Sequence, residues 1–481
     1  MKKVELEHGA DGHAHHLLPP GTMTIRARID GIARNKMLRS IGVLVGGTAF
    51  AHVITALTLP IVTRLYTPAD FSGLALFAGL LAILSVAATL RFDLAIAIPE
   101  QDSEAVNLLA LAIVCTSIVA ALVATVVIGL PANVVDSLNQ PKLVPLLWLL
   151  PVGVLLAGCY SALQMWFVRQ RAFEPIARSR VTQSAASAAT QIGLGWLHWT
   201  PGGLILGQLL NTGAGCISLG YRLLLRHHAL IRQISWSGLR DAFAKYDRFP
   251  KYSTFEALSN TAAMQLPIIM ISSHAASSEA GFLLLAMSAM QAPMGLIGNA
   301  IAQVYLSRAP EELRNGNLNN FTSTVFGGLL RSGVGPLMFA GIVAPTLFSV
   351  VFGVEWRRAG ILVSWMTPWF IMQYLSVPIS MALHVTGSQK VALILQIFGM
   401  CLRVGVVYVV SINDPTHISE AYAISGLIFY AIYLATVLKI VRSSIEDVIH
   451  ELYRGIVPVL PWVVSGGLII AFDHLQNIFG S

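Results

Sequence analysis

A few charged residues lie inside long apolar stretches of this 481-residue sequence, where a charge is costly and is therefore a candidate for function. Arg403 lies near the middle of VALILQIFGMCLRVGVVYVV and is the most deeply placed charge. We expect it to face a cavity or a carboxylate, where it either contacts an anionic substrate or forms a structural pair. Arg331 precedes a stretch that is long enough to span a membrane by itself, so it either binds substrate or reaches the membrane interface.

A carboxylate follows a basic residue in RFDLAIAIPE, the segment from Arg91 to Glu100. Arg91 and Asp93 lie two residues apart at the end of an apolar stretch. Asp93 is a candidate for binding a proton or a cation beside a substrate contact of Arg91, and the alternative is an ion pair at a membrane edge. His52, in the first apolar stretch, and Arg64, at its outer end, are further candidates.

A stripe of polar residues precedes Pro267 in another apolar stretch. Glu256 and Asn260 are four residues apart and therefore share one face of a helix, and Gln265 follows them. Such a stripe predicts a wet surface, on which Asn260 and Gln265 contact substrate and Glu256 binds a proton or a cation. The alternative is hydrogen bonding to a neighbouring helix.

The stretches that carry these residues predict an all-α integral membrane protein. Hydrophobic residues make up 55% of the sequence and charged residues 11%, and the mean hydropathy is +0.69. A soluble domain carries about 25% charged residues. A hydrocarbon core roughly 30 Å thick needs about 20 apolar residues, and the stretches lack the alternation of barrel strands. Thirteen stretches qualify: 40–63, 71–90, 106–130, 144–168, 181–199, 202–224, 254–275, 281–305, 322–352, 360–383, 390–410, 420–438 and 455–473.

The basic residues predict the orientation. If the N-terminus is cytoplasmic, 25 Lys and Arg residues fall on the inward segments and 4 on the outward ones. Lys and Arg accumulate in cytoplasmic loops of membrane proteins, so we expect a cytoplasmic N-terminus. The same loops explain the pI near 9.3 better than nucleic-acid binding does.

No familiar catalytic or metal-binding motif occurs in the sequence. The phosphate loop GxxxxGK[ST], the zinc motif HExxH and a compact Ser/His/Asp set are all missing. We therefore expect no catalytic residue, no metal and no cofactor, with a coupling H⁺ or Na⁺ as the remaining possibility. The cysteines have no paired spacing and are expected to pack within spans, and the histidines of the N-terminal tail are expected to be incidental: Cys115, Cys159, Cys216, Cys401, His8, His13, His15 and His16.

The longest polar interruption, residues 221–251, separates six spans from the seven that follow. It predicts five parts: a cytoplasmic tail over 1–39, an N-lobe of six spans over 40–224, a cytoplasmic linker over 225–253, a C-lobe of six spans over 254–440, and an extra helix with a short tail over 441–481. The linker mixes basic and apolar residues and is typical of an amphipathic helix at a membrane surface.

An internal similarity relates the two lobes. TLPIVTRLYTPADFSGLALFA from Thr58 aligns with QLPIIMISSHAASSEAGFLLLA from Gln265, with one residue of slippage before Gly73 and Gly281. Pro60 and Pro267 occupy matching places and are predicted hinges. Six spans precede the matching position in the second lobe, so the lobes have the same orientation and form a parallel pseudo-two-fold repeat around a central cavity.

Four segments carry a resemblance to a known family: 60–77, 91–99, 170–184 and 249–267. They resemble the polysaccharide biosynthesis transporters, the oligosaccharide-lipid flippases of O-antigen lipopolysaccharide, capsule and exopolysaccharide pathways. Multidrug extruders and the lipid-linked peptidoglycan precursor flippase belong to the same superfamily. Arg64, Arg91, Asp93 and Pro267 stand at matching positions. Relatives often carry a basic residue in the eighth span before a proline, where this chain has Ser288.

The resemblance implies a transporter, and not an enzyme, in the bacterial inner membrane. Its expected activity is the flipping of an undecaprenyl-diphosphate-linked oligosaccharide from the inner to the outer leaflet by alternating access. A polysaccharide polymerase and a chain-length regulator are expected partners, and nucleic acid is not. The alternatives are a multidrug or small-cation extruder and a membrane-embedded glycan polymerase or ligase. The short outward loop over 130–143 argues against the last of these.

Overall fold

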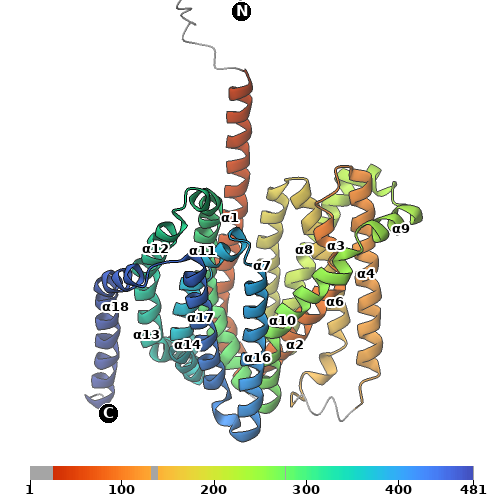
Figure 1. Ribbon diagram of the computed structural model, residues 1–481. Helices are drawn as coiled ribbons and strands as arrows, with labels where there is room; N and C mark the ends of the chain where they lie inside the picture. Colours follow the sequence, from red (N-terminus) through yellow and green to blue (C-terminus); the bar gives the residue numbers. More distant parts are fainter. Residues whose placement is uncertain (1–24, 132–138, 277, 480–481) are drawn as a thin grey trace, which may run out of the picture.

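In the computed structural model of the chain, the described residues are 25–131, 139–276 and 278–479, and they form helices without a strand among them (Figure 1). Long helical segments coincide with every predicted span. They are α1 (Ile25–Leu65), α2 (Pro68–Ala88), α4 (Asp102–Ile128), α6 (Leu149–Arg169), α7 (Phe173–Trp196), α8 (Gly202–Ile231), α10 (Thr254–His274), α11 (Glu279–Arg314), α12 (Leu318–Leu329) continuing into α13 (Gly335–Phe352), α14 (Arg357–Ser376), α16 (Gln389–Asn413), α17 (Ile418–Val441) and α18 (Ile445–Phe479). The tail histidines lie outside the described residues.

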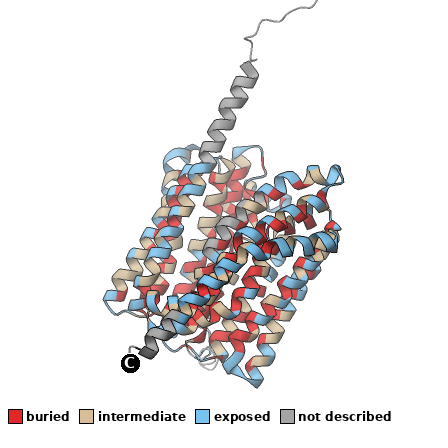
Figure 2. Ribbon diagram, turned by 90° about the vertical axis from the view of Figure 1, so that its left-hand side faces the viewer, coloured by how far each residue is buried: buried red, intermediate tan, exposed pale blue. Residues whose placement is uncertain are grey.

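The helices have the length and composition of a multi-pass membrane protein. Among the described residues, nine segments are long and apolar enough to cross a membrane. The four other predicted spans correspond to α7, α10, α11 and α14, which carry more polar residues. Large apolar side chains are exposed on the outer helices, as at Ile118 and Leu122 of α4 and Ile412 of α16, where lipid would cover them (Figure 2). The prediction of an all-α integral membrane protein is confirmed.

The helices form two lobes. In the first, α7 packs against α1 and α8, and α4 packs against α6. In the second, α14 packs against α13 and α17, and α16 packs against α17. Figure 1 shows the early helices mainly on one side of the molecule and the late, blue helices on the other, with α2 and α10 crossing between them. The lobe boundaries at residues 224 and 254 stay predictions, since α8 continues past 224 to Ile231.

The long helix α1 defines the two ends of the bundle. We call the end from which the N-terminal segment projects the proximal end, and the opposite end, where α1 turns into α2, the distal end (Figure 1). At this turn the Thr67 side chain accepts a hydrogen bond from the Asp70 backbone N–H, and the Asp70 carboxylate caps Thr67 in return. This capping box fixes the start of α2.

The linker forms a short helix at the proximal end, α9 (Trp236–Lys245), which packs against α4. Lys245 Nζ lies 2.6 Å from Glu104 Oε1 of α4. This hydrogen bond raises the pKa of Lys245 above its usual value. Leu239 and Ala242 are buried while Arg240, Asp241 and Lys245 are exposed, so α9 is amphipathic as the sequence predicted.

The last helix, α18, packs along α13 of the second lobe. Arg331 Nη1 lies 2.8 Å from Glu451 Oε2 of α18, and the Trp462 ring fills the space beside Gly335. Arg331 therefore does not extend alone, and its binding of substrate stays a prediction. Its guanidinium is paired with a carboxylate that the sequence places 120 residues further along the chain.

Candidate functional site

The two lobes meet at the distal end through the hairpins that are similar in sequence, α1–α2 and α10–α11. The Gly281 backbone N–H donates to Ser72 Oγ over 2.8 Å. A Cβ atom on Gly281 would lie 2.0 Å from the Pro68 carbonyl oxygen, so only glycine allows α11 to approach α2 this closely. The aligned Gly73 has no atom nearer than 3.9 Å to its Cβ position. The two hairpins therefore share a sequence pattern, but Gly281 lies in a close contact between the lobes and the aligned Gly73 does not.

A tryptophan completes this contact. Trp356, at the start of α14, is 1% exposed, and its Nε1–H donates to the Thr63 carbonyl oxygen of α1 over 2.9 Å. Its ring meets Phe71 of α2 edge-on at 4.8 Å between centroids, and Phe282 of α11 at 5.9 Å. We call the contacts of Thr63, Ser72, Gly281 and Trp356 the distal seal.

Arg64 belongs to the same contact between the lobes. Its Nη2 donates to the Val350 carbonyl oxygen of α13 over 3.2 Å. The guanidinium itself is exposed at the distal end. In this conformation the Arg64 side chain therefore holds the second lobe against the first, with its guanidinium at the distal surface.

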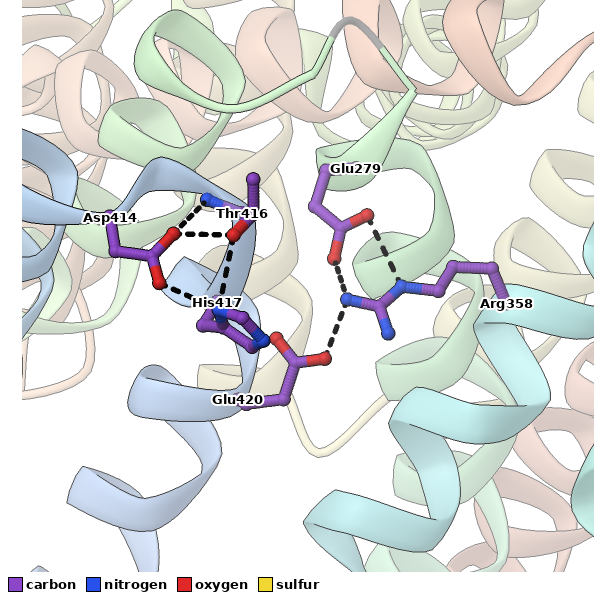
Figure 3. Close-up of polar contacts among 6 residues, drawn as sticks. All are labelled: Glu279, Arg358, Asp414, Thr416, His417 and Glu420. Carbon is purple, nitrogen blue, oxygen red and sulfur yellow. Dashed lines mark hydrogen bonds and ion pairs between the residues drawn. The ribbon is translucent and has the colours of Figure 1, made fainter.

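Three charged side chains hold together the helix starts on the second-lobe side of the seal (Figure 3). Arg358 of α14 lies 2.8 Å from Glu279 Oε1 at the start of α11 and 2.6 Å from Glu420 Oε1 in the first turn of α17. Both carboxylates are buried, and Glu420 Oε2 has no hydrogen-bond partner among the described residues. Because Glu279 is two residues from Gly281 and Arg358 two residues from Trp356, this cluster fixes the positions of both seal residues.

The loop before α17 carries a second polar group beside this cluster (Figure 3). Asp414 accepts hydrogen bonds from the Thr416 backbone N–H and from the His417 ring. Hydrogen bonds from Thr416 and His417 hold the pKa of Asp414 below its usual range. The group caps the short turn Pro415–His417 and is exposed, so it stabilises the loop and forms no closed site.

We expect Gly281→Ala to open the distal seal. The added methyl group meets a backbone carbonyl that cannot rotate away, and overpacking of this kind costs about 1–3 kcal/mol. A cysteine introduced at Ile269, which packs against α2 beside Gly79, should become reactive to a membrane-impermeant maleimide from the distal side, in a chain with its own cysteines replaced by serine. Gly405→Ala is the matched control, because its Cβ position has no atom within 4 Å. Equal labelling of the two variants would contradict this role of Gly281.

Polar residues are exposed on the proximal part of α10. Glu256 and Asn260 are both exposed, and neither has a hydrogen-bond or ion-pair partner among the described residues. Gln265 is half-buried, with Oε1 3.5 Å from the Cβ position of Gly79 on α2. An amide or carboxylate inside a span is costly against lipid, so this face of α10 belongs next to water or a polar ligand. The structure thus separates Gln265, between the lobes, from Glu256 and Asn260 on the open face.

Asp93 and Arg91 lie together in sequence but are not paired. Asp93 is 4% exposed and accepts hydrogen bonds from Thr89 Oγ1 over 2.9 Å and from Ser161 Oγ over 2.6 Å. Arg91 has a left-handed backbone with φ 61°, makes no ion pair with Asp93, and its buried Nε has no hydrogen-bond partner among the described residues. The alternative of an Arg91–Asp93 ion pair at the membrane edge is therefore wrong, and both side chains keep unused capacity for a ligand.

Arg403 lies inside the second lobe. It is 3% exposed, its Nε donates to the Gly399 carbonyl oxygen over 3.1 Å, and its guanidinium lies 4.5 Å from the ring centre of Phe429 on α17. Tyr422 and Tyr430 of α17 surround it, and no carboxylate pairs with it among the described residues. An aromatic ring thus stabilises the cation in place of the expected carboxylate, and contact of Arg403 with an anionic substrate stays a prediction.

Pro60 and Pro267 lie inside the uninterrupted helices α1 and α10. Pro267 is buried, and the hydroxyl of Thr63 donates to the Pro60 carbonyl oxygen over 3.1 Å. Pro60 lies three residues before Thr63 of the distal seal, and Pro267 lies seven residues before the distal end of α10. Their function as hinges stays a prediction.

The charged cluster beside the distal seal was missed by sequence reasoning. Glu279, Arg358 and Glu420 are each at or near the first residue of a helix, so charges at three span ends on one side of the membrane were the available signal. His52 is exposed on α1. Across the described ranges, no three His, Cys, Asp or Glu side chains gather into a group that could hold a metal ion.

The two-lobed helical fold is similar to the folds of solved transporter structures. It matches the lipid II flippase MurJ in an inward closed conformation with a TM-score of 0.64 and 12% identity, over 90% of this chain and 99% of that chain. It matches an inward-facing MATE multidrug resistance transporter with a TM-score of 0.62 and 14% identity, over 81% of this chain and 94% of that one. The Vibrio cholerae MATE transporter VcmN, as its D35N mutant, matches with a TM-score of 0.51 and 11% identity, over 86% and 98%. At these identities the likeness shows the fold.

The family follows from the sequence. A family model described as "Polysaccharide biosynthesis protein" matches residues 61–360, which is more than half of the chain. The chain belongs to this family of polysaccharide biosynthesis proteins. No curated protein sequence matches it.

Proposed function

We propose that this protein flips a polyprenyl-diphosphate-linked oligosaccharide, of the undecaprenyl type, across the bacterial inner membrane for the assembly of a surface polysaccharide. The observation that carries the proposal is the distal seal between two lobes whose proximal helices expose polar residues. A substrate with a polar head enters such a structure from one side only. With the N-terminus cytoplasmic, as the loop charges predict, that side is the cytoplasm.

Membership in a polysaccharide biosynthesis family and the fold of transporters together support this substrate class. Alternating access then consists of opening the distal seal while the proximal side closes, with the polyprenyl tail remaining in lipid. Bending at Pro60 and Pro267 lets the two hairpins separate, since each proline lacks one backbone hydrogen bond. A polysaccharide polymerase and a chain-length regulator are the expected partners on the outer side.

Arg91 is the proposed contact for the diphosphate. It is half-buried, it makes no ion pair among the described residues, and its Nε is free. A guanidinium stays charged and matches phosphate oxygens in a bidentate manner. Asn260 and Gln265 would bind glycan hydroxyls, and Arg64 would meet the diphosphate once the seal opens. Arg403 and Arg331 are engaged by aromatic rings and by Glu451, so we do not assign substrate contacts to them.

Asp93 is the proposed coupling carboxylate, and Glu256 is the second candidate. Asp93 is buried and has two hydroxyl donors but no cation, so a proton or Na⁺ would neutralise it at little structural cost. Glu256 is exposed at the proximal end of α10, where a proton or a cation can reach it from the proximal side. A dependence of transport on a proton or sodium gradient that Asp93→Asn removes would support this assignment.

The test is an export assay in the native host. Deleting the gene should abolish the surface polysaccharide while the polyprenyl-diphosphate-linked oligosaccharide accumulates, and the wild-type chain should restore export. Arg91→Gln should lower export at least tenfold, since a charge-assisted hydrogen bond contributes about 1.5–3 kcal/mol. Arg240→Gln, on the exposed linker helix, is the matched control.

The second candidate function is export of drugs or small organic cations, which the likeness to a multidrug transporter makes worth testing. Drug tolerance measured beside glycan export separates the two. Loss of drug tolerance with an unchanged surface polysaccharide in the deletion strain would contradict the flippase proposal.

A further inference from the structure

A small polar pocket lies inside the first lobe, among α1, α7 and α8. It has a volume of about 100 Å³, and its walls are Thr55, Thr58 and Leu59 of α1, Ser184, Ser187, Ala188 and Gln191 of α7, and Gln208 and Asn211 of α8. No charged side chain lines it. None of its residues was singled out by the sequence pattern.

The pocket is built by close helix packing. Gly207 of α8 lies so near α7 that a Cβ there would be 2.4 Å from Gln191 Cγ. A Cβ on Gly203 would likewise lie 2.0 Å from the Tyr66 hydroxyl oxygen. Tyr66, at the distal end of α1, donates to the Gln191 carbonyl oxygen over 2.8 Å. These contacts close the distal side of the pocket, whereas Thr55 is exposed and marks an open side.

Polar groups in the pocket have unused hydrogen-bonding capacity. Ser184 and Ser187 are each 8% exposed, and neither hydroxyl is hydrogen-bonded within the described part of the chain. The side-chain amides of Gln191, Gln208 and Asn211 likewise have no partner there. Unpaired polar groups at membrane depth are costly, so they must be satisfied by water or by a polar ligand.

The chemistry of the walls selects the ligand class. Amides and hydroxyls are donors and acceptors in similar numbers, which suits a neutral ligand with several hydroxyl groups. A diphosphate would need arginine, lysine or a helix N-terminus, and the pocket offers none of them. The volume of about 100 Å³ equals that of about three waters, each of which occupies about 30 Å³ in the liquid. It therefore takes the hydroxyl-bearing edge of one sugar ring, with the rest of the ring at the open side of the pocket. An oligosaccharide does not fit.

We propose that this pocket binds one uncharged sugar unit of the lipid-linked glycan. The proposal rests on the proposed function and locates part of its specificity: the diphosphate binds at Arg91, while the edge of a single pyranose ring enters the pocket. Leu59 lines the pocket next to Pro60, so occupation by a ring bears directly on the helix that must bend. Binding of the sugar is thereby coupled to the conformation of α1. Through this coupling the protein distinguishes the glycan-loaded carrier lipid from the glycan-free one.

Binding to the full chain in lipid nanodiscs tests this proposal. The probes are farnesyl diphosphate and its conjugates with glucose, galactose and N-acetylglucosamine, and thermophoresis measures affinity. At least one conjugate should bind the wild-type chain tenfold or more tightly than farnesyl diphosphate does. Asn211→Leu and Gln208→Met keep the volume of the side chain and remove its hydrogen bonds, so each should abolish that preference and leave the affinity for farnesyl diphosphate unchanged.

Asn413→Leu is the matched control, because Asn413 is exposed at the distal end of α16, far in sequence from the pocket. It should keep the wild-type preference. The proposal is overturned if no conjugate is preferred, as expected for a pocket that holds water only, or if the preference survives in both folded pocket variants. If the wild-type chain binds neither farnesyl diphosphate nor any conjugate, the proposed function fails together with the inference, and this result is distinct from the other two.

Discussion

Trp356→Ala is expected to open the distal seal and to reduce glycan export more than any other single substitution at the distal end. Truncating a buried tryptophan costs about 3–5 kcal/mol. The lost contacts include the hydrogen bond to the Thr63 carbonyl oxygen and the ring contact with Phe71, both of which join the lobes. Since every 1.4 kcal/mol changes an equilibrium tenfold, even half of this cost shifts the balance between sealed and open states at least tenfold.

The measurement is labelling of a cysteine placed at Ile269, from the distal side, together with export in the native host. Trp365→Ala is the matched control, because Trp365 lies on the same helix and is 50% exposed on its surface. A Trp356→Ala protein that is folded, remains unlabelled and exports normally would show that the seal does not depend on this side chain.

Arg403→Ala and Arg403→Met are expected to differ sharply in their effect on the free energy of unfolding. Alanine leaves a cavity beside Phe429 and Tyr422, at a site that is 3% exposed, and should cost about 2–5 kcal/mol in the free energy of unfolding. Methionine fills much of the same space without a charge. Because Arg403 has no carboxylate partner among the described residues, removing its charge in this way should be neutral or stabilising.

Thermal unfolding in nanodiscs and glycan export in the native host measure the two effects. If Arg403 acts through packing, the methionine variant exports normally and the alanine variant loses export in proportion to its loss of folded protein. A methionine variant that is fully folded and yet does not export would instead show that the guanidinium takes part in transport.

Composition and periodicity were sufficient for the fold class because a lipid environment imposes them directly. Each span must present about 20 apolar residues to a hydrocarbon core, and every predicted span corresponds to a helix in the structure. This includes α7, α10, α11 and α14, which are too polar to face lipid on all sides. The similarity between the segments at Thr58 and Gln265 also located the two hairpins that meet at the distal end.

The candidate site was only partly predictable, for a different reason. Depth along a span can be read from position in the sequence, and Arg403 is indeed buried. The direction of a side chain around the helix axis depends on which neighbours pack there, and the sequence does not give those neighbours. Arg331 pairs with Glu451, Arg64 binds the Val350 backbone, and Cys159 of α6 contacts Cys216 of α8. The spacing of these residues in the sequence does not indicate any of the three contacts.

The charged residues inside apolar stretches therefore differ in the partners that the tertiary structure brings to them. The sequence by itself determined that these side chains are costly in lipid and must have a partner. Packing decided that Arg403 is held by aromatic rings, that Arg91 and Asp93 remain apart, and that Glu279, Arg358 and Glu420 come together at the distal end. The cluster of Glu279, Arg358 and Glu420 spans 141 positions of the chain, and only folding of the second lobe brings its members within reach of one another.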